Sequence, residues 1–509
     1  MIRRVPFHPL LFAAFPILFL YARNVQGEVS PRDLILPLLV TIAGATLLAS
    51  MFWLVFRDVH RAGIGASVLI LLALSFGHVE DLVDPIGVGR TRPLLLVGWG
   101  LLLLAGILAI AKPREGFRKA TEILNIVAIV LCAMNVVPIV RFESTTTQQR
   151  LGAEARALGL DRGGEKRDIY YLIFDRYAAD RTLRDLYGFD NSAFSDWLQK
   201  QGFYVANDSV ANYPKTIHSL ASSLNMDYLS GLAGEVGRDS DDWDPLTHSL
   251  KGFRAATTLK EAGYRYEHLG SWWLPTATDP AADEEFVFGE LSSFGRLVFE
   301  STIVPALADG LGLRERVSFE LQQYRRVGFQ FEALERISND PAPTFTFAHF
   351  TLPHPPYVFN ADGSFADPEE VAAKTREQAY LDQLSYTNGE VKELVGQLLS
   401  GPSDADPIIV LQSDEGPDPV RFLKDEAGFD WTEASDAELG EKLRILNAYF
   451  LPGIDDAALY PTISPVNTFR LILARYFGAD VPMLPDRTFV FQSSAHPYRF
   501  TEVTDRLHP

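Results

Sequence analysis

The sequence predicts a block of five membrane helices followed by an α/β domain with a mainly parallel sheet. Three observations lead to this fold class. Five uncharged apolar runs lie within the first 140 residues, short apolar strands alternate with helical patterns in the rest of the chain, and the charge changes sign between the two parts. Residues 1–145 carry 13 basic and 9 acidic side chains, a net charge of +4, whereas residues 146–509 carry 33 and 56, a net charge of −23.

Each apolar run approaches the ~20 residues that a helix needs to cross about 30 Å of hydrocarbon. The runs are Pro6–Tyr21, Leu34–Phe56, Ala62–Val79, Pro93–Ala111 and Ile123–Val140. A secretory signal peptide is the alternative interpretation of the first and shortest run. We favour a membrane span, because no small-residue cleavage site precedes Arg23 and four more runs follow.

The loops between the runs predict the orientation, because cytoplasmic loops are enriched in Lys and Arg. Alternate loops, starting with the N-terminus, contain Arg3, Arg4, Arg57, Arg61, Lys112, Arg114, Arg118 and Lys119. The opposite loops contain Arg23, Arg32, Arg90 and Arg92 together with the acids Glu28, Asp33, Glu80, Asp81 and Asp84. We therefore expect a bacterial-type cytoplasmic membrane protein with its N-terminus inside and everything after Val140 outside the cytoplasm.

The same patterns set the expected domain boundaries. Residues 1–141 form the membrane domain, residues 142–166 a polar linker or interfacial helix, and residues 167–509 the soluble domain. The membrane domain is interpreted as an anchor rather than a transporter, because its apolar runs contain no Asp, Glu, Lys or Arg. The single cysteine, Cys132, lies in the fifth run, which excludes a disulfide scaffold.

Strands separated by longer helices predict a parallel sheet with helices on both faces of the soluble domain. The expected strands are Asp168–Phe174, Phe203–Val205, Tyr264–Leu269, Phe345–Phe350, Pro407–Gln412 and Ala448–Leu451. The expected helices are Asn191–Gln201, Gly252–Ala262, Thr375–Leu399 and Val466–Phe477, with helical periodicity and turn signals over Leu297–Ile337. Such sheets bind ligands at the carboxyl ends of their strands. The strong negative charge argues against a nucleic-acid partner.

Acidic residues follow two of the expected strands. Asp168–Phe174 is followed by Asp175, and Pro407–Gln412 is followed by Ser413, Asp414 and Glu415. Carboxylates gathered at one edge of a sheet repel each other unless a cation lies between them, so the pattern is compatible with a metal site. Solvated loop acids or helix caps are the alternative.

Two further elements carry groups that suit phosphate chemistry. Lys215 and Thr216 stand where a helix begins, and Thr216 as its N-cap would adjoin free backbone N–H groups that can hold an anion. His349 and His354 lie five residues apart at the end of a strand, where an imidazole can donate to a phosphate or protonate a leaving group. The alternatives are an ordinary threonine cap, and one packed histidine with one loop histidine. Trp272 and Trp273 are interpreted as sugar- or lipid-binding or as buried aromatic residues.

Together these motifs resemble the alkaline phosphatase superfamily, and most closely its membrane-anchored sulfatase-like branch of lipoteichoic-acid synthases, phosphoethanolamine transferases and glucan phosphoglycerol transferases. The resemblance covers roughly residues 165–455, and the membrane block matches in architecture only. It implies an alkaline phosphatase-like catalytic domain outside the cytoplasm. It also implies Thr216 and His354 as catalytic residues, Lys215, Ser219 and His349 as substrate-binding residues, and Asp175, Thr216, Asp414 and Glu415 as ligands of one divalent metal ion.

The late motif departs from this family, which has Asp-His-Gly where this chain has Asp414-Glu415-Gly416. Glutamate makes the implied ligand set all oxygen, which favours Mg²⁺, Mn²⁺ or Ca²⁺ over Zn²⁺. The resemblance implies transfer of a phospho-headgroup from an envelope lipid to a glycan or lipid acceptor through a covalent Thr216 intermediate. A phosphodiesterase or phosphatase on the same site, and a non-catalytic envelope protein with a degenerate site, remain alternatives.

Overall fold

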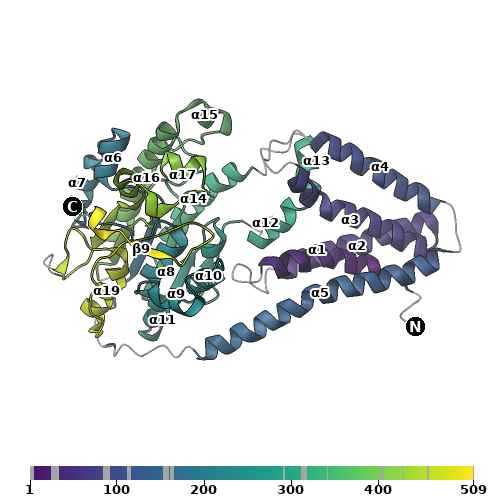
Figure 1. Cartoon of the computed structure of the whole chain (residues 1–509), viewed down its shortest axis with the longest axis horizontal. Helices are drawn as coiled ribbons and strands as arrows, with labels where there is room; N and C mark the ends of the chain where they lie inside the picture. The colour runs from purple at the N-terminus through teal and green to yellow at the C-terminus, as the bar shows by residue number, and fades with distance from the viewer. Residues whose placement is uncertain are drawn as a thin grey trace. The chain divides into compact units, whose positions relative to one another are not determined.

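A computed structural model describes residues 5–24, 34–83, 92–111, 116–152, 160, 166–289, 293–310, 318–340, 342–401, 405–426, 428–454 and 458–507. The chain divides into two compact units, one of residues 1–154 with 289–318 and one of residues 155–288 with 319–509 (Figure 1). The loop residues Arg3, Arg4, Glu28, Arg32, Asp33, Asp84, Arg90, Lys112 and Arg114, and most of the expected linker after residue 152, lie outside the described residues.

Five apolar helices form the N-terminal unit, as the sequence predicts. They are α1 (His8–Asn24), α2 (Ile35–Phe56), α3 (Val59–Val83), α4 (Arg92–Ala111) and α5 (Phe117–Gly152). The last four contain segments long and apolar enough to cross a membrane. With 17 residues, α1 is shorter, so the count of five spans and the orientation remain predictions. The fifth helix also continues well beyond Val140, through the first part of the expected linker.

Polar contacts fix α1 among its neighbours. The His8 ring pairs with the Ser67 hydroxyl of α3 at 2.7 Å, and the Asn125 side chain of α5 accepts from the His8 backbone N–H at 2.9 Å. Between apolar helices, such hydrogen bonds specify which faces meet. Two short helices from much later in the chain, α12 (Ser293–Glu300) and α13 (Val304–Gly310), belong to the same unit.

The second unit is built on a seven-stranded sheet of order β2-β7-β6-β1-β5-β3-β4. The strands are β1 (Ile169–Phe174), β2 (Tyr204–Val205), β3 (Arg265–Leu269), β4 (Glu284–Phe286), β5 (Thr344–Phe350), β6 (Ile408–Gln412) and β7 (Asn447–Phe450). The five strands from β6 to β4 are parallel, and β7 runs antiparallel to β6 and β2. Continuous apolar runs suit these central strands, because both faces of the sheet are covered.

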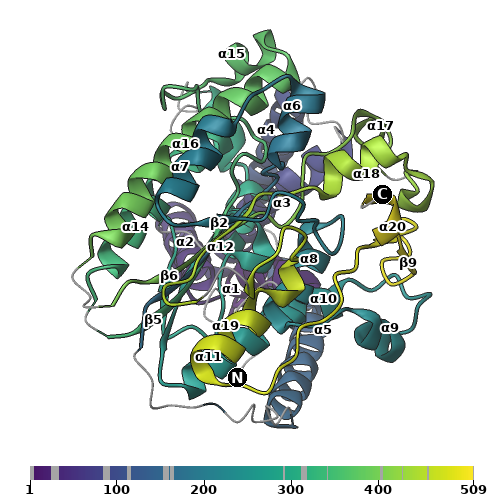
Figure 2. The same cartoon turned by 90° about the vertical axis from the view of Figure 1, so that its left-hand side faces the viewer.

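Helices cover both faces of the sheet, which confirms the predicted fold class (Figure 2). One face packs against α8 (Thr216–Asn225), α11 (Arg254–Glu261) and α19 (Thr468–Phe477), and the other against α7 (Ser192–Lys200), α14 (Phe319–Ile337) and α16 (Arg376–Leu399). The remaining elements are α6 (Asp180–Tyr187), α9 (Ser230–Val236), α10 (Asp244–Ser249), η3 (Leu274–Thr276), α15 (Pro368–Ala373), α17 (Val420–Lys424), η5 (Trp431–Glu433), α18 (Asp436–Leu443), η7 (Pro465–Asn467), β8 (Phe489–Phe491), β9 (Phe500–Glu502) and α20 (Thr504–Leu507).

Each of the six expected strands is present within two residues of its expected bounds. The short strand β4 and the two-stranded sheet of β8 and β9 were not expected. Helical periodicity over Leu297–Ile337 corresponds to parts of α12, α13 and α14, which belong to different units. Thr216 is the first helical residue of α8, and Lys215 occupies the N-cap position expected for Thr216.

Candidate functional site

The three central strands β6, β1 and β5 bring sequence-predicted residues to one edge of the sheet. Ile173 of β1 is in register with His349 of β5 and Gln412 of β6. Asp175 and Asp414 lie two residues beyond Ile173 and Gln412, at the carboxyl ends of their strands. Because side chains alternate along a strand, Asp175, His349 and Asp414 all fall on the face that α8 covers.

Asp175, His349 and Asp414 form a buried cluster. One ligand atom of each lies within 4.8 Å of the others, and the His349 Nε2 and Asp175 Oδ2 atoms are 3.7 Å apart. The exposed fractions of the three residues are 3%, 0% and 1%. Two carboxylates and an imidazole converging in this way are a set of donors that can hold a divalent metal ion.

Several polar atoms of this cluster lack a hydrogen-bond partner. Among the described residues, Asp175 Oδ1, both carboxylate oxygens of Asp414 and His349 Nε2 are buried without a hydrogen bond. Burial, reinforced by repulsion from Glu415, raises the pKa of Asp175 to about 7. Burial and repulsion from Asp175 also raise the pKa of Asp414 well above its usual value. A cation held between the carboxylates would relieve this cost, so the residues fit a bound metal ion.

A chain of hydroxyl groups fixes the His349 ring. Its Nδ1 atom lies 2.7 Å from the Thr276 hydroxyl, which lies 2.9 Å from the Ser271 hydroxyl. The Ser271 hydroxyl in turn contacts the backbone carbonyl of Trp273 at 3.4 Å. If each group donates toward that carbonyl, Nδ1 carries the ring proton and Nε2 offers a lone pair to the cluster. Burial lowers the pKa of His349 to about 4, which keeps the ring neutral.

Thr216 stands beside the cluster at the start of α8. Its side chain is among the groups that lower the pKa of Asp414, against the larger effect of burial, which places the sequence-predicted nucleophile near this carboxylate. Most of α8 is buried against the sheet, which fixes the position of its first turn. The N-terminus of a helix also presents backbone N–H groups that favour a bound anion.

Glu415 is not part of this cluster, and the structure places it in an ion-pair network instead. Its Oε1 atom accepts a hydrogen bond from the buried Lys442 Nζ at 2.7 Å, and Lys442 also donates to Asp418 Oδ1 at 2.5 Å. Arg176 approaches the same two carboxylates at 3.5 and 2.8 Å. Two cations thus neutralise Glu415 and Asp418. Whether Glu415 ever acts as a metal ligand is untested and stays a prediction from the sequence.

Gly416 allows the loop after β6 to approach α18 closely. A Cβ atom at this position would lie 2.3 Å from the Glu441 backbone oxygen. The Gly416 N–H donates to the Lys442 carbonyl at 2.6 Å. This contact sets Glu415 against the Lys442 side chain, and any larger residue would push the two apart.

The remaining predicted substrate-binding residues lie near the start of α8. The Lys215 ammonium pairs with Glu426 at 2.8 Å and lies over the Phe422 ring. The Ser219 side chain is buried, and its hydroxyl has no hydrogen-bond partner among the described residues. Neither belongs to the Asp175, His349 and Asp414 cluster.

His354 packs against aromatic neighbours. Its ring contacts Trp272 at a centroid distance of 5.8 Å, and Trp273 packs edge-on against His349 at 5.9 Å. The two tryptophans therefore support the two histidines. Burial holds the pKa of His354 well below its usual value. Its Nδ1 atom is hydrogen-bonded to the Pro355 carbonyl, and because a carbonyl only accepts, Nδ1 carries the proton and Nε2 is an acceptor.

Sequence reasoning missed several residues of this region. It placed His349 with the substrate rather than in the acidic cluster. The position of His349 beside Ile173 depends on which strands pair, and the sequence alone does not show that pairing. Thr276 and Lys442 approach from elements far along the chain. Asp418 gave the only local signal, as a third acid shortly after β6.

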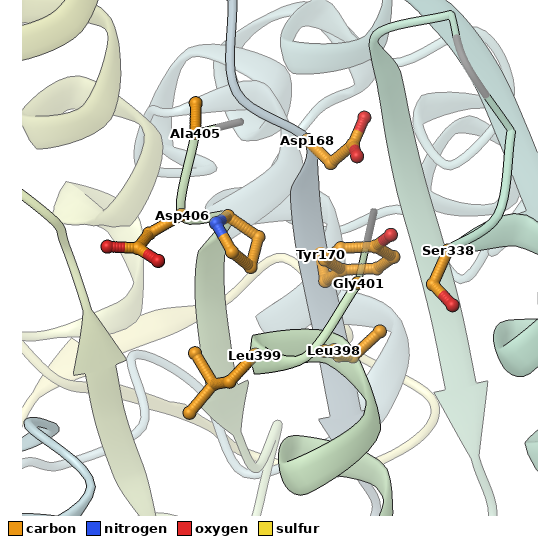
Figure 3. A pocket seen from close by; sticks show the side chains of 9 residues that line it. Asp168, Tyr170, Ser338, Leu398, Leu399, Gly401, Ala405 and Asp406 are labelled. Carbon is orange, nitrogen blue, oxygen red and sulfur yellow. The ribbon is translucent and has the colours of Figure 1, made fainter. Parts of the chain in front are cut away.

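A separate pocket lies at the opposite, amino-terminal edge of the sheet (Figure 3). It is lined by Asp168, Tyr170, Ser338, Leu398, Leu399, Gly401, Ala405, Asp406 and Pro407. The Asp168 carboxylate already accepts hydrogen bonds from the Thr344 backbone and hydroxyl at 2.8 and 3.1 Å. This pocket contains none of the residues of the acidic cluster, and its Asp168 carboxylate has a structural role.

No family model and no curated protein matches the sequence. Solved structures with a similar fold include the C-terminal periplasmic domain of EcEptC from Escherichia coli in a complex with Zn, at 13% identity and a TM-score of 0.44, covering 67% of this chain and 94% of that one. The integral membrane lipooligosaccharide phosphoethanolamine transferase A (EptA) from Neisseria meningitidis is 12% identical with a TM-score of 0.38, covering 93% and 95%. The lipoteichoic acid synthase LtaP from Listeria monocytogenes is 13% identical with a TM-score of 0.40, covering 66% and 83%.

Replacing Thr276 with Val should weaken divalent-metal binding by about 10- to 100-fold, because the hydroxyl that holds the His349 Nδ1 proton is lost. Calorimetric titration of the metal-free, full-length protein with Zn²⁺ or Mn²⁺ measures the affinity. Thr346→Val is the matched control, since this buried threonine lies on the opposite face of β5 and its hydroxyl has no partner. Equal affinities for the two variants would show that the hydroxyl chain does not orient the ligand.

Replacing Lys442 with Met should lower the free energy of unfolding by about 3–5 kcal/mol, because two buried carboxylates lose the more buried of their two cations. Urea denaturation of the full chain in detergent measures the change. Adding Glu415→Gln to this variant should recover part of the loss. Lys260→Met removes the more exposed pair with Asp283 and should cost less than about 1 kcal/mol. A similar small cost for Lys442→Met would contradict the proposed charge compensation.

Proposed function

We propose that this integral membrane protein transfers a phospho-headgroup from an envelope lipid to a glycan or lipid acceptor through a covalent intermediate on Thr216. One observation supports the proposal: Thr216 at the start of α8 lies near Asp414, whose pKa it lowers, and Asp414 belongs to a buried cluster in which several oxygens have no hydrogen-bond partner among the described residues. A nucleophilic hydroxyl beside a cation site at a helix N-terminus is an arrangement suited to phosphoryl transfer.

Asp175, His349 and Asp414 are proposed to hold one divalent metal ion. When bound, the ion would neutralise charge on the phosphoryl oxygens and favour the ionised form of the Thr216 hydroxyl. The imidazole of His349 makes this donor set mixed nitrogen and oxygen. The preference for Mg²⁺, Mn²⁺ or Ca²⁺ that followed from an all-oxygen set therefore no longer applies, and Zn²⁺ or Mn²⁺ becomes the better candidate.

In the first step, the Thr216 oxygen attacks the phosphorus of the lipid headgroup. The new Oγ–P bond forms as the bond from phosphorus to the lipid oxygen breaks. Asp414 accepts the hydroxyl proton, and the departing lipid alkoxide takes a proton from solvent. The backbone N–H groups at the start of α8 bind the phosphoryl oxygens and stabilise the charge that develops on them.

In the second step, an acceptor hydroxyl attacks the phosphothreonine, and the Oγ–P bond breaks. Asp414 returns its proton to the Thr216 oxygen. His354 was expected to donate a proton to the leaving group, but its proton lies on Nδ1 and its ring is neutral. We therefore assign it the opposite role, in which Nε2 accepts the proton of the attacking hydroxyl and releases it to solvent.

The membrane helices give this chemistry a physical setting. A lipid substrate and a tethered enzyme share one surface, which raises their effective concentration relative to free diffusion. The proposal keeps the orientation that the loop charges predict, with the N-terminus inside and the α/β unit outside the cytoplasm.

Replacing Thr216 with Ala should reduce headgroup release by at least about 10³-fold, because the proposed nucleophilic oxygen is lost. Release of fluorescent diacylglycerol from labelled phosphatidylglycerol and phosphatidylethanolamine measures the activity. Thr468→Ala is the matched control: Thr468 is also the first residue of a ten-residue helix on the same face of the sheet, and its variant should retain most activity.

Mass spectrometry of the wild-type protein quenched during turnover should detect the headgroup phosphate on Thr216. Comparing products with and without added glycan then separates transfer from hydrolysis. Unchanged release by the Thr216→Ala variant would refute the covalent mechanism, and an inactive wild-type protein that still binds metal would favour a non-catalytic role.

A further inference from the structure

The helices α12 and α13 interrupt the α/β unit in sequence but pack with the membrane helices. They lie between β4, which ends at Phe286, and α14, which begins at Phe319. Residues 289–318 nevertheless group with the N-terminal helices. The chain therefore leaves the α/β unit after β4, enters the membrane unit and returns at α14.

Apolar contacts hold this segment against the N-terminal helices. The Phe294 ring meets the buried Tyr21 of α1 edge-on at a centroid distance of 5.7 Å. Phe294 and Val298 share one buried cluster with Ile17 and Leu20 of α1. The helix α12 therefore presents one apolar face to the membrane helices.

Backbone hydrogen bonds anchor the turn between α12 and α13 to α3. The Gly77 N–H donates to the Ser301 carbonyl at 2.9 Å, and the Ile303 N–H donates to the Ala73 carbonyl at 2.8 Å. A Cβ atom at Gly77 would lie 2.4 Å from the Glu300 backbone oxygen and 2.7 Å from Ser301 Cα. Only glycine allows this approach, because backbone atoms cannot move aside as a flexible side chain can.

These anchor points lie within the membrane-spanning part of α3, which runs from Val59 to Glu80. At a rise of about 1.5 Å per residue, Gly77 lies roughly 4–5 Å and Ala73 roughly 10 Å inside the Glu80 end of the span. Non-helical backbone is tolerated at such depth only where protein satisfies its polar groups. The hydrogen bonds to the Ser301 carbonyl and from the Ile303 N–H satisfy these two polar groups of the turn.

The side-chain hydroxyls of the turn are also satisfied internally. Ser301 donates to the Val298 carbonyl and Thr302 to the Phe299 carbonyl, each at 2.7 Å. Glu300 lies level with Gly77, one turn from the end of the span, where a carboxylate can reach the headgroup region. The hairpin of α12 and α13 therefore offers few bare polar groups to lipid.

We propose that residues 293–310 form a hairpin embedded in the bilayer, with the exposed face of α13 in contact with lipid acyl chains. Val304 and Leu307 are 47% and 49% exposed, whereas Ala306 of the same helix is buried. The hairpin contacts the bilayer leaflet at the Glu80 end of α3, because it extends the apolar surface of that spanning helix at the same depth in the membrane. This surface binds lipid whether or not the proposed chemistry is correct.

The hairpin gives the α/β sequence a second attachment to the membrane unit. The first is the covalent link that follows α5, and the hairpin adds two more chain crossings, before residue 289 and after residue 318. Both ends of the segment are thereby fixed to a lipid-contacting element.

Site-specific quenching tests the proposal in the full chain reconstituted in phosphatidylglycerol and phosphatidylethanolamine nanodiscs. In a Cys132→Ser background, which removes the only native cysteine, Leu307→Cys carries an environment-sensitive fluorophore. Leu101→Cys on α4 supplies the lipid reference. Leu186→Cys on α6 supplies the reference on the α/β unit, and its exposure of 49% equals that of Leu307.

We expect lipid-borne nitroxides to quench the label at Leu307 at least twofold more strongly than the label at Leu186, and aqueous iodide to quench it less. Val304→Cys should give the same result, which guards against a folding defect in one variant. Quenching at both positions by iodide but not by lipid nitroxide would overturn the proposal. Protection from both quenchers would also overturn it, because a second copy or another part of the chain would then cover α13.

A matched pair of glycine variants tests the anchor. Gly77→Ala should lose at least half of the lipid quenching at Leu307, because the added methyl group displaces the turn. Gly98→Ala on α4 should leave the quenching unchanged, since nothing lies within 4 Å of a Cβ atom there. Equal quenching in the two variants would show that the turn does not depend on its contact with α3.

Discussion

Unequal charge compensation at one edge of the sheet is the constraint on which this structure depends. Four carboxylates gather after β1 and β6. Glu415 and Asp418 are neutralised by Lys442 and Arg176. Asp175 has only a neutral histidine as a neighbour within ion-pair distance, and Asp414 has no ion pair among the described residues. Since buried carboxylates without partners are costly, this partition marks the place where an additional cation could be held.

Sheet topology and helix packing together produce this partition. Parallel neighbours bring the ends of β6, β1 and β5 to one edge, and side-chain alternation sends the unpaired residues toward α8. Gly416 lets the loop after β6 approach α18, which delivers Lys442 to Glu415. Lys442 and Arg176 thus neutralise the acids on one side of this edge, whereas Asp175 and Asp414, near Thr216, have no such cation among the described residues.

The sequence predicted those parts of the site that depend on local pattern. The central strands are apolar runs followed by acids, so Asp175 and Asp414 could be placed at strand ends, and the expected helix start placed Thr216 within one residue of its position. It could not predict that His349 faces the carboxylates, because this depends on which strand pairs with β1 and in which register. Nor could it predict the pairing of Glu415 with Lys442, 27 residues away, or the packing of α12 and α13 with the N-terminal helices, since their periodicity resembles that of any amphipathic helix.

The glutamate at position 415 has a structural partner of its own in this fold. A carboxylate in place of a metal-binding histidine adds a buried charge, and the buried Lys442 compensates it at 2.7 Å. An imidazole nitrogen is still supplied, but from β5 through His349. A site without a ligand would gain stability by replacing Asp175 or Asp414 with neutral residues, because each buried carboxylate opposes folding unless a cation accompanies it. Both carboxylates instead remain buried, with Asp175 Oδ1 and both Asp414 oxygens without a hydrogen bond among the described residues, an arrangement that is compatible with a bound metal ion.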